Sequence, residues 1–258
     1  PALSRLVPRN RREPYEMREA IRLIFDQDGD GTSSFFEIGT TDFGKTQITG
    51  LARLDGHPVA VFANDGAVLA GAMTADGAQK VRRLLDLANL FGLPVVALVD
   101  EPGFMIGVEA EKQATIRHGT SLVLTAQTAT VPWAVVHVRK AYGVAAAAHF
   151  APGAFVLSWP SAERGTLPVE SGVAVMFSRK LRQVAEDDGE PAANALREEL
   201  ENKYGASLSP FPAAHGFGVH DLIDPQETRP QLCRWLALHR PLLQHRLRDG
   251  GSGAVYRP

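Results

Sequence analysis

The fold and the function of this chain are both indicated by the stretch Val138-Arg-Lys-Ala-Tyr-Gly-Val-Ala-Ala-Ala-Ala-His149. An apolar run, Trp133–Val138, precedes it and predicts a buried strand that ends in a basic turn. A helix of small residues is expected to begin at Gly143. The first N–H groups of a helix lack intrahelical partners and lie at the positive end of its dipole. Because alanine side chains leave these groups accessible, we predict a site for an oxygen that carries negative charge, as enolate chemistry requires.

The elements on either side of this stretch alternate between strands and helices. The turn Asp55-Gly56 predicts a hairpin, and Gly119 is the expected break in a helical segment that ends near residue 128. This order predicts an α/β fold with layered sheets. In chain order we expect a helix over 15–25, strands over 48–54 and 58–63, a helix over 76–91, a strand over 94–99, helical structure to residue 128, a strand over 131–138, a helix over 144–150, a strand over 154–159, and helices over 169–181, 190–203 and 229–247.

Length and composition bound the domain organisation. The chain has 258 residues, of which 45% are hydrophobic and 22% are charged, and this suits one large domain or two small ones. We assign residues 1–14 to a proline-rich linker, residues 15–249 to one α/β domain, and residues 250–258 to a flexible, glycine-rich tail. The chain begins at Pro1 rather than at Met, so we expect it to be processed or cut from a longer protein.

Charge, hydropathy and cysteine content exclude several classes of function. A net charge of -2 and a pI of about 6.5 do not favour a nucleic-acid surface. No apolar run approaches the length of a membrane span, and the first residues do not form a signal peptide. Cys233 is the single cysteine, so an internal disulfide and a cysteine-based zinc site are both excluded. These features fit a cytoplasmic protein that binds neither nucleic acid nor a membrane.

A second glycine-containing loop, Asp100-Glu-Pro-Gly-Phe-Met-Ile-Gly107, follows the preceding buried strand. Ligands of α/β sheets bind beyond the carboxyl ends of the strands. Gly103 and Gly107 allow a ligand to approach the backbone closely, and Phe104 offers a stacking face. An ordinary strand-to-helix turn is the alternative. Two such glycine turns, each after a buried strand, favour a shared site more than either does alone.

Several short motifs occur together over most of the chain: Pro14-Tyr-Glu-Met-Arg-Glu19, Ile48-Thr-Gly-Leu-Ala-Arg53, His57-Pro-Val, Leu93-Pro-Val-Val, Val99-Asp-Glu-Pro-Gly-Phe104, Ile116-Arg-His-Gly119, Arg139-Lys-Ala-Tyr-Gly143 and Asp221-Leu-Ile-Asp-Pro225. Through these motifs, which are in family order, the chain resembles the C-terminal half of the carboxyltransferase (β) subunit of biotin-dependent acyl-CoA carboxylases. The propionyl-CoA and methylcrotonyl-CoA carboxylases are of this type. Each motif alone is weak evidence, but the combination is specific.

The resemblance implies a crotonase-like fold, a superhelix of ββα units with layered sheets and flanking helices. It implies an enzyme that transfers a carboxyl group from carboxybiotin to the α-carbon of an acyl-CoA. Biotin, carried on a separate protein or domain, is then the cofactor, and acyl-CoA is the substrate. Matched to the family motif, the N–H groups of Val144 and Ala145 form the hole for the biotin ureido oxygen, and Gly143 sets their geometry. Residues expected to line the biotin or acyl pocket are Pro102, Gly103, Phe104, Gly107 and Ala147.

Two residues depart from the family pattern at this turn. Val144 stands where the family usually has a second glycine, and its β-branched side chain disfavours positive φ. The hole therefore requires Val144 to be helical already. Ala147 stands where the family has an aspartate that is associated with acyl-chain preference. We expect a roomier or more apolar acyl site, and neutral drift within a subfamily is the alternative.

The first half of the family subunit has no counterpart in this chain. In the family, that N-terminal domain holds the thioester enolate, and the active site lies between domains of different protomers. The resemblance therefore implies four partners: an N-terminal carboxyltransferase domain, a biotin carboxyl carrier protein, a biotin carboxylase and further copies of the chain in a homo-oligomer. Two alternatives stay open, namely a subunit of a biotin-dependent acyl-CoA decarboxylase and a non-catalytic assembly half.

Two further patterns have simpler explanations. Asp26-Gln-Asp-Gly-Asp-Gly31 with Glu37 matches the spacing of an EF-hand calcium loop, but a strand is expected where the exit helix belongs. His118 lies near Glu109 and Glu111 and is a weak candidate for acid/base chemistry, for which helix surface residues are the favoured interpretation. We therefore expect no metal site and no catalytic acid/base side chain.

Overall fold

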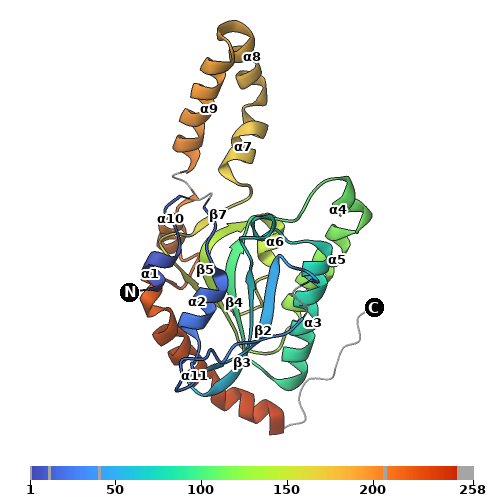
Figure 1. Cartoon of the computed structure of the whole chain (residues 1–258), viewed down its shortest axis with the longest axis vertical. Helices are drawn as coiled ribbons and strands as arrows, with labels where there is room; N and C mark the ends of the chain where they lie inside the picture. Colours follow the sequence, from blue (N-terminus) through green and yellow to red (C-terminus); the bar gives the residue numbers. More distant parts are fainter. Residues whose placement is uncertain (1, 11–12, 40–41, 206–207, 249–258) are drawn as a thin grey trace.

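The backbone forms one mixed sheet with helices on both faces. The computed structural model describes residues 2–10, 13–39, 42–205 and 208–248. Figure 1 shows the sheet at the centre of the molecule. Its order is β1-β2-β3-β4-β5-β6-β8, and β7 pairs with the end of β5. The strands are β1 (Phe36–Glu37), β2 (Gln47–Leu54), β3 (His57–Asn64), β4 (Val95–Glu101), β5 (Trp133–Tyr142), β6 (Phe155–Ser158), β7 (Glu163–Gly165) and β8 (Asp221–Leu222).

The sheet combines an antiparallel part with a parallel part. β1, β2 and β3 are antiparallel neighbours. Leu54 lies opposite His57, so Asp55 and Gly56 form the predicted hairpin turn, with φ of 51° and 76°. From β3 onward the pairings with β4, β5, β6 and β8 are parallel. The carboxyl ends of β4 and β5 therefore share one edge of the sheet, which is where both glycine-containing loops begin.

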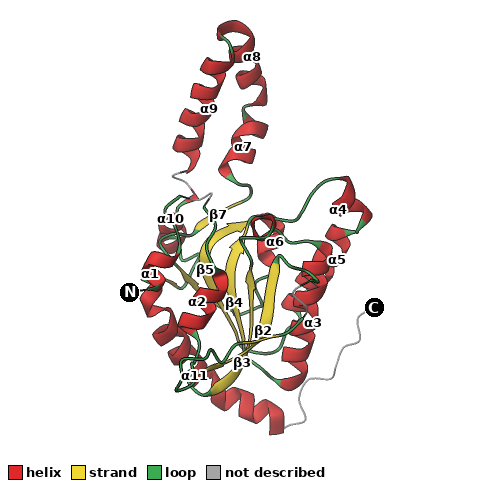
Figure 2. Cartoon of the chain, viewed as in Figure 1, coloured by secondary structure: helices red, strands yellow, loops and turns green. Residues whose placement is uncertain are grey.

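Helices cover the two faces of the sheet in separate layers (Figure 2). Ile21 of α2 and Leu232 of α11 belong to the core on one face. Leu84 of α3 and Leu122 of α5 belong to the core on the other. The helices are α1 (Leu3–Leu6), α2 (Met17–Ile24), η1 (Leu69–Gly71), α3 (Ala75–Phe91), α4 (Val108–Lys112), α5 (Thr115–Gln127), α6 (Gly143–Ala147), α7 (Val169–Met176), α8 (Ser178–Asp188), α9 (Glu190–Gly205), α10 (Pro210–His215), η3 (Pro225–Glu227) and α11 (Thr228–Arg248).

Helices α7, α8 and α9 form an arm that projects from the body of the molecule (Figure 1). The arm has a small apolar cluster of its own, made by Val169, Val173, Leu181 and Leu200. The single helix expected over 169–181 is wrong, because the backbone at Phe177 is non-helical (φ -111°, ψ 14°). The Phe177 ring instead packs on Tyr204 of α9, with 5.4 Å between the ring centres.

Other boundaries also differ from the sequence predictions. The helical segment before residue 128 breaks at Ala114, where φ is 55° and ψ is 43°, and not at Gly119. Gly119 stays helical and gives room to Phe104, since a Cβ there would lie 2.3 Å from the Phe104 ring. β5 extends past residue 138 to Tyr142 because its end pairs with β7. Leu3 of α1, in the segment assigned as a linker, is buried in the core.

The remaining expected elements are confirmed, with ends that differ by no more than three residues. The predicted tail over 250–258 lies outside the described residues. Within the described ranges, no helix has both the length and the apolar character needed to cross a bilayer.

Candidate active site

A buried ion pair joins the two loops at the carboxyl edge of the sheet. Arg139 of β5 donates from Nε and Nη2 to Asp100 Oδ2 at 3.1 and 3.0 Å. Asp100 Oδ1 accepts the N–H of Lys140 at 3.0 Å. Arg139 Nη1 also donates to the Glu13 carbonyl at 2.7 Å, and its guanidinium lies 4.7 Å from the centre of the Tyr15 ring. The ends of β4 and β5 and the N-terminal segment are thus held in one arrangement.

The chain changes direction after β5 at Gly143. Its φ of 62° is in the left-handed region that favours glycine. A Cβ at this position would lie 3.2 Å from the carbonyl oxygen of Thr166. The preceding residue, Tyr142, is extended (φ -112°, ψ 139°), and its hydroxyl donates to the carboxylate of Glu163 on β7. The turn therefore has a backbone that suits glycine and close neighbours that leave little room for a side chain.

Helix α6 begins at this turn. As the first N–H groups of a helix, those of Val144 and Ala145 have no carbonyl partner within it. Val144 belongs to the helix and has no positive φ, so its β-branched side chain causes no backbone strain. Val144 is 71% exposed, whereas Ala145 is 1% exposed and packs in the core. The predicted hole required Val144 to have a helical conformation, and the structure shows that it does.

A pocket of about 610 Å³ opens beside α6. Its lining consists of Gln127, Ala141, Gly143, Ala146, Ala147, Phe150, Arg164, Gly165 and Ala213. Gly143 and Ala147, two of the predicted site residues, are therefore brought together. Most of the lining residues are small, which leaves the space beside α6 open.

The loop after β4 lies at the same edge of the sheet, but its predicted site residues do not line this pocket. Glu101 anchors the loop, because its Oε1 accepts the N–H groups of Gly103 at 2.9 Å and Met73 at 3.3 Å. Its Oε2 accepts the amide of Asn64 at 2.9 Å. Complete burial raises the pKa of Glu101 to about 8, against the opposing effect of these hydrogen bonds. The predicted site residues outside the pocket lining are Pro102, Gly103, Phe104 and Gly107 of this loop, together with Val144 and Ala145 of α6.

Two histidines that the sequence analysis did not single out lie in the interior near α6. His149, just after α6, stacks on Phe62 with 5.1 Å between ring centres. His137 of β5 meets the edge of Phe150 at 5.4 Å. Burial lowers the pKa of His137 to about 3 and that of His149 to about 4. Both rings are therefore neutral at physiological pH and act as packing groups.

Arg164 is the functional candidate that sequence reasoning missed. It is the charged residue among those lining the pocket, and it lies on the short strand β7. Its Nη1 donates to the Gly218 carbonyl at 2.7 Å. A strand of this length has no readable periodicity, so no pattern in the sequence places Arg164 beside Gly143.

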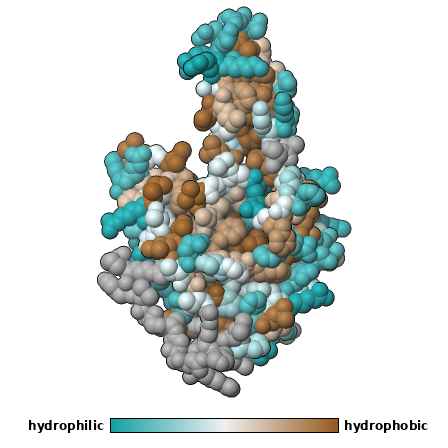
Figure 3. All heavy atoms as spheres, turned by 180° about the vertical axis from the view of Figure 1, so that it is seen from behind, coloured by the Kyte–Doolittle hydropathy of each residue, from teal (hydrophilic) through white to brown (hydrophobic). Residues whose placement is uncertain are grey.

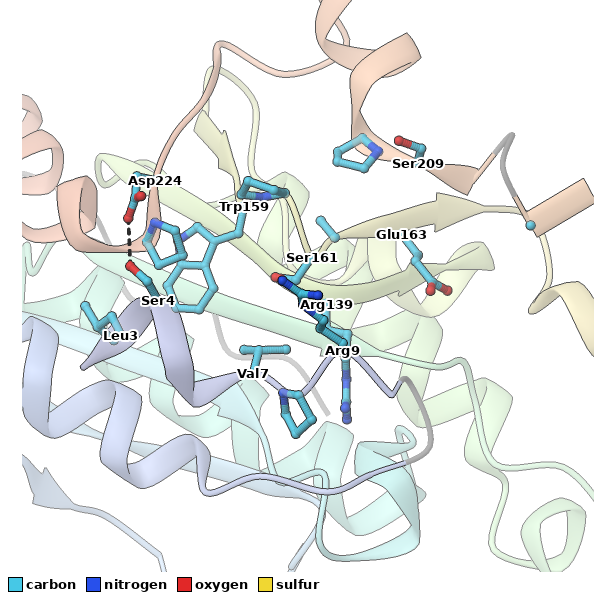
Figure 4. Close-up of a pocket in the computed structure, with 16 residues that line it drawn as sticks. Leu3, Ser4, Val7, Arg9, Arg139, Trp159, Ser161, Glu163, Ser209 and Asp224 are labelled. Atoms are coloured by element: carbon cyan, nitrogen blue, oxygen red, sulfur yellow. Dashed lines mark hydrogen bonds between the residues drawn. The ribbon is translucent and has the colours of Figure 1, made fainter. Parts of the chain in front are cut away.

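A second cavity, also of about 610 Å³, lies near the N-terminal segment. Figure 4 shows Arg139, Trp159 and Glu163 around it, and a hydrogen bond from Ser4 to Asp224 at its rim. Glu163 lines this cavity and Arg164 lines the pocket beside α6, as expected for adjacent residues of a strand, which point to opposite sides. None of the predicted site residues lines this second cavity.

The residues that match the EF-hand pattern make structural contacts within the chain. Asp26 accepts the N–H groups of the hairpin turn at Asp55 and Gly56, at 3.0 and 2.7 Å. Glu37 lies on a strand and pairs with Arg18 at 2.8 Å. In the part of the chain that the structure describes, no three His, Cys, Asp or Glu side chains are grouped to hold a metal ion.

The weak acid/base candidates lie on α4 and α5 and are not brought to the pocket. Glu109 pairs with Lys112 at 2.7 Å on the exposed surface of α4. His118 is half-buried on α5, outside the pocket lining.

The comparison with known proteins identifies the family. Residues 1–246 match the model of the carboxyl transferase domain. The chain belongs to the carboxyl transferase family. The carboxyltransferase subunit of propionyl-CoA carboxylase from Haloferax mediterranei is 34% identical over 89% of this chain and 43% of its own length. The methylmalonyl-CoA carboxyltransferase 12S subunit of Propionibacterium freudenreichii is 30% identical over 93% of this chain and 44% of its own length.

Solved structures confirm the expected crotonase-like carboxyltransferase fold. A transcarboxylase 12S hexamer with methylmalonyl-coenzyme A and methylmalonic acid bound has a TM-score of 0.80 at 30% identity. The match covers 93% of this carboxyl transferase chain and 44% of the 12S chain. A single-chain, multi-domain long-chain acyl-CoA carboxylase has a TM-score of 0.76 at 31% identity, with 91% of this chain and 23% of the other covered. The chain thus spans less than half the length of these relatives.

Proposed function

We propose that this chain supplies the biotin-side half of a carboxyltransferase active site, in an enzyme that transfers a carboxyl group from carboxybiotin to the α-carbon of an acyl-CoA. The observation that carries the proposal is the turn at Gly143, from which α6 starts with two N–H groups that lack intrahelical partners. The family membership of residues 1–246 supports the reaction class.

The residues at the turn fit a biotin ureido group. Gly143 has no side chain to cover the helix start, and Val144 and Ala145 offer two adjacent N–H donors. Carboxybiotin, when bound, supplies the carboxyl group. Donors that are fixed in the backbone stabilise negative charge on an oxygen without reorganising, and the loss of one such donor lowers the rate by about 10²–10³.

The pocket beside α6 suits binding of a substrate rather than proton transfer. Among the residues that the structure describes, the lining contains no carboxylate, histidine, lysine, cysteine or tyrosine. Ala146 and Ala147 leave space for an acyl chain, in line with the roomy acyl site expected from the sequence. We include Pro102, Gly103, Phe104 and Gly107 in the proposal as residues that line the acyl or biotin pocket once the other half of the active site is in place.

The partners proposed for this half are the N-terminal carboxyltransferase domain, a biotin carboxyl carrier protein, a biotin carboxylase and further copies of the chain. Apolar side chains on the surface support such an assembly, and Figure 3 shows brown patches on the arm and on the body. Exposed apolar residues of these regions include Val175 and Met176 on α7, and Ile106, Val108 and Ile116 around α4. The hexamer of the transcarboxylase 12S relative is consistent with this arrangement.

The N–H donor at residue 144 is tested by comparing Val144→Ala with Val144→Pro in the assembled enzyme. Both variants lack the valine side chain, but the proline variant also lacks the donor, and proline is tolerated in the first turn of a helix. We expect carboxyl transfer to be about 10²–10³ lower in Val144→Pro than in Val144→Ala. Equal turnover in the two variants would contradict the proposed hole.

A second variant, Gly143→Val, tests the geometry of the turn. A β-branched residue resists φ of 62° and meets the Thr166 carbonyl, so we expect carboxyl transfer to be abolished. The matched control is Gly172→Ala on α7, where a Cβ has no neighbour within 4 Å. Circular dichroism of both variants confirms that the fold is retained. Wild-type turnover in Gly143→Val would favour a non-catalytic assembly role for this half.

A further inference from the structure

We infer that the pocket beside α6 binds a carboxylate at the far end of the acyl chain, and that Arg164 recognises it. The substrate class is then an acyl-CoA whose acyl group ends in a second carboxylate. This inference rests on the proposed function, because it names the substrate that the same site takes.

Arg164 is a half-buried cation that has no counter-ion in the part of the chain that the structure describes. Its hydrogen bond from Nη1 to the Gly218 carbonyl, at 2.7 Å, uses one of the five N–H donors of the guanidinium. Among the described residues, no carboxylate forms an ion pair with it. Burial lowers the pKa of Arg164, with no opposing contribution from a nearby acid. A charge that is withdrawn from water in this way is stabilised by an anionic partner.

The nearest acid along the chain is already engaged on the other side of β7. Glu163 lines the second cavity and accepts the hydroxyl of Tyr142. Burial and, to a smaller extent, the charge of Arg164 lower the pKa of His137 to about 3. This neutral ring offers no negative charge. The partner of Arg164 must therefore come from outside the described chain.

The rest of the pocket suits an aliphatic chain that leads to this charge. Gly143, Ala146 and Ala147 leave its α6 side open, and Phe150 provides an apolar wall. A volume of about 610 Å³ is within the usual range of small-molecule sites. A guanidinium binds a carboxylate through two parallel N–H···O bonds, which gives both affinity and orientation.

A remote carboxylate fits this position better than the carboxyl group that biotin carries. The transferred carboxyl group must lose its charge as it leaves biotin, and a strong ion pair with Arg164 would stabilise the ground state instead of the transition state. A second carboxylate on the acyl chain keeps its charge throughout the reaction, so an ion pair at Arg164 binds it without opposing the chemistry.

Turnover of two acyl-CoA substrates of equal chain length tests the inference in the assembled enzyme. We expect kcat/KM for glutaryl-CoA to exceed that for pentanoyl-CoA by at least about tenfold in the wild type. Arg164→Met should lower kcat/KM for glutaryl-CoA by about 10–100-fold and leave that for pentanoyl-CoA within about threefold, while Arg164→Lys should keep part of the preference. Arg179→Met on the exposed surface of α8 is the matched control.

Two kinetic outcomes overturn the inference. One is a wild-type preference for pentanoyl-CoA, and the other is a glutaryl-to-pentanoyl ratio of kcat/KM that Arg164→Met does not change. An equal loss on both substrates would assign Arg164 to the carboxyl group on biotin. Titration of the 258-residue chain with the monomethyl and the dimethyl ester of glutaric acid, followed by calorimetry, separates this inference from the proposed function. The monomethyl ester keeps the far-end carboxylate and the dimethyl ester lacks it. Tighter binding of the monomethyl ester that Arg164→Met abolishes supports the pocket even if the assembled enzyme transfers no carboxyl group, and equal binding of the two esters contradicts it.

Discussion

Arg139 and Asp100 form a buried ion pair, with 3.0 Å between Nη2 and Oδ2, that holds the ends of β4 and β5 together. The side chains are 5% and 0% exposed. Asp100 begins the Asp100–Gly107 loop, and Arg139 lies in β5 four residues before Gly143. The pair therefore fixes the position of that loop relative to the strand that leads into the Gly143 turn. The geometry of the candidate site therefore depends on a contact that contains no site residue.

Replacing one partner of this pair is expected to destabilise the fold. Arg139→Met leaves the Asp100 carboxylate buried and without its counter-ion, so we expect the free energy of unfolding to fall by about 3–5 kcal/mol. Urea denaturation measures the change. Lys112→Met is the control, because its pair with Glu109 is exposed and its loss should cost less than about 1 kcal/mol. Similar losses in both variants would show that the buried pair has no special role.

The raised pKa of Glu101 predicts that the free energy of unfolding falls as the pH rises. Burial raises its pKa from 4.5 to about 8 in the folded state, so the folded chain binds more protons than the unfolded chain between these two values. Its contribution to stability is therefore highest below pH 4.5 and declines by up to about 1.4 kcal/mol per pH unit until pH 8. Urea denaturation at several pH values should show a shallower decline in Glu101→Gln. Equal pH slopes in the wild type and the variant would contradict this.

The lowered pKa of His149 predicts that the free energy of unfolding falls as the pH drops into the acid range. Its pKa falls from 6.5 to about 4 on burial, so the unfolded chain binds more protons in this window and stability is lost as the pH drops through it. We expect His149→Met, which cannot titrate, to lose about 1–2 kcal/mol less than the wild type between pH 7 and pH 5. The comparison uses urea midpoints and slopes at both pH values. A variant as acid-sensitive as the wild type would argue against a buried neutral ring.

Gly119 makes room for the aromatic ring that anchors the Asp100–Gly107 loop. A Cβ at residue 119 would lie 2.3 Å from Phe104, so Gly119→Ala must displace the ring and should lower the free energy of unfolding by about 1–3 kcal/mol. Gly172→Ala, also in a helix but with open space around it, should instead be neutral or stabilising by up to about 1 kcal/mol. Urea denaturation of both variants gives the comparison. Gly119→Ala that is as stable as Gly172→Ala would disprove the close contact.

Local patterns in the sequence predicted most of the fold. The hairpin at Asp55-Gly56 and the helix over 76–91 follow from turn chemistry and from apolar spacing, which depend on neighbouring residues alone. The break at Ala114 was missed because alanine is a strong helix former, so the residue itself gives no signal of a break. The break at Phe177 was missed because Phe177 makes its contact elsewhere in the fold. At Phe177, the contact is with Tyr204, which lies on a different helix.

The sequence predicted only the part of the candidate site that lies within one continuous motif. Gly143, Val144 and Ala145 are adjacent in the chain, and the helix start that they form is the one expected from the sequence. Arg164 was not foreseen, because it enters the pocket through the pairing of β7 with the end of β5. A pairing between a three-residue strand and the last residues of another strand leaves no periodic signal in the sequence.

The most direct test of the central claim observes the backbone N–H groups of Val144 and Ala145 during a titration of the chain with biotin. If these groups bind the ureido oxygen, their amide proton and nitrogen chemical shifts should change with biotin concentration more than those of other residues, and Gly143→Val should abolish the change. Shifts at Val144 and Ala145 that stay constant while biotin saturates another part of the chain would contradict the account.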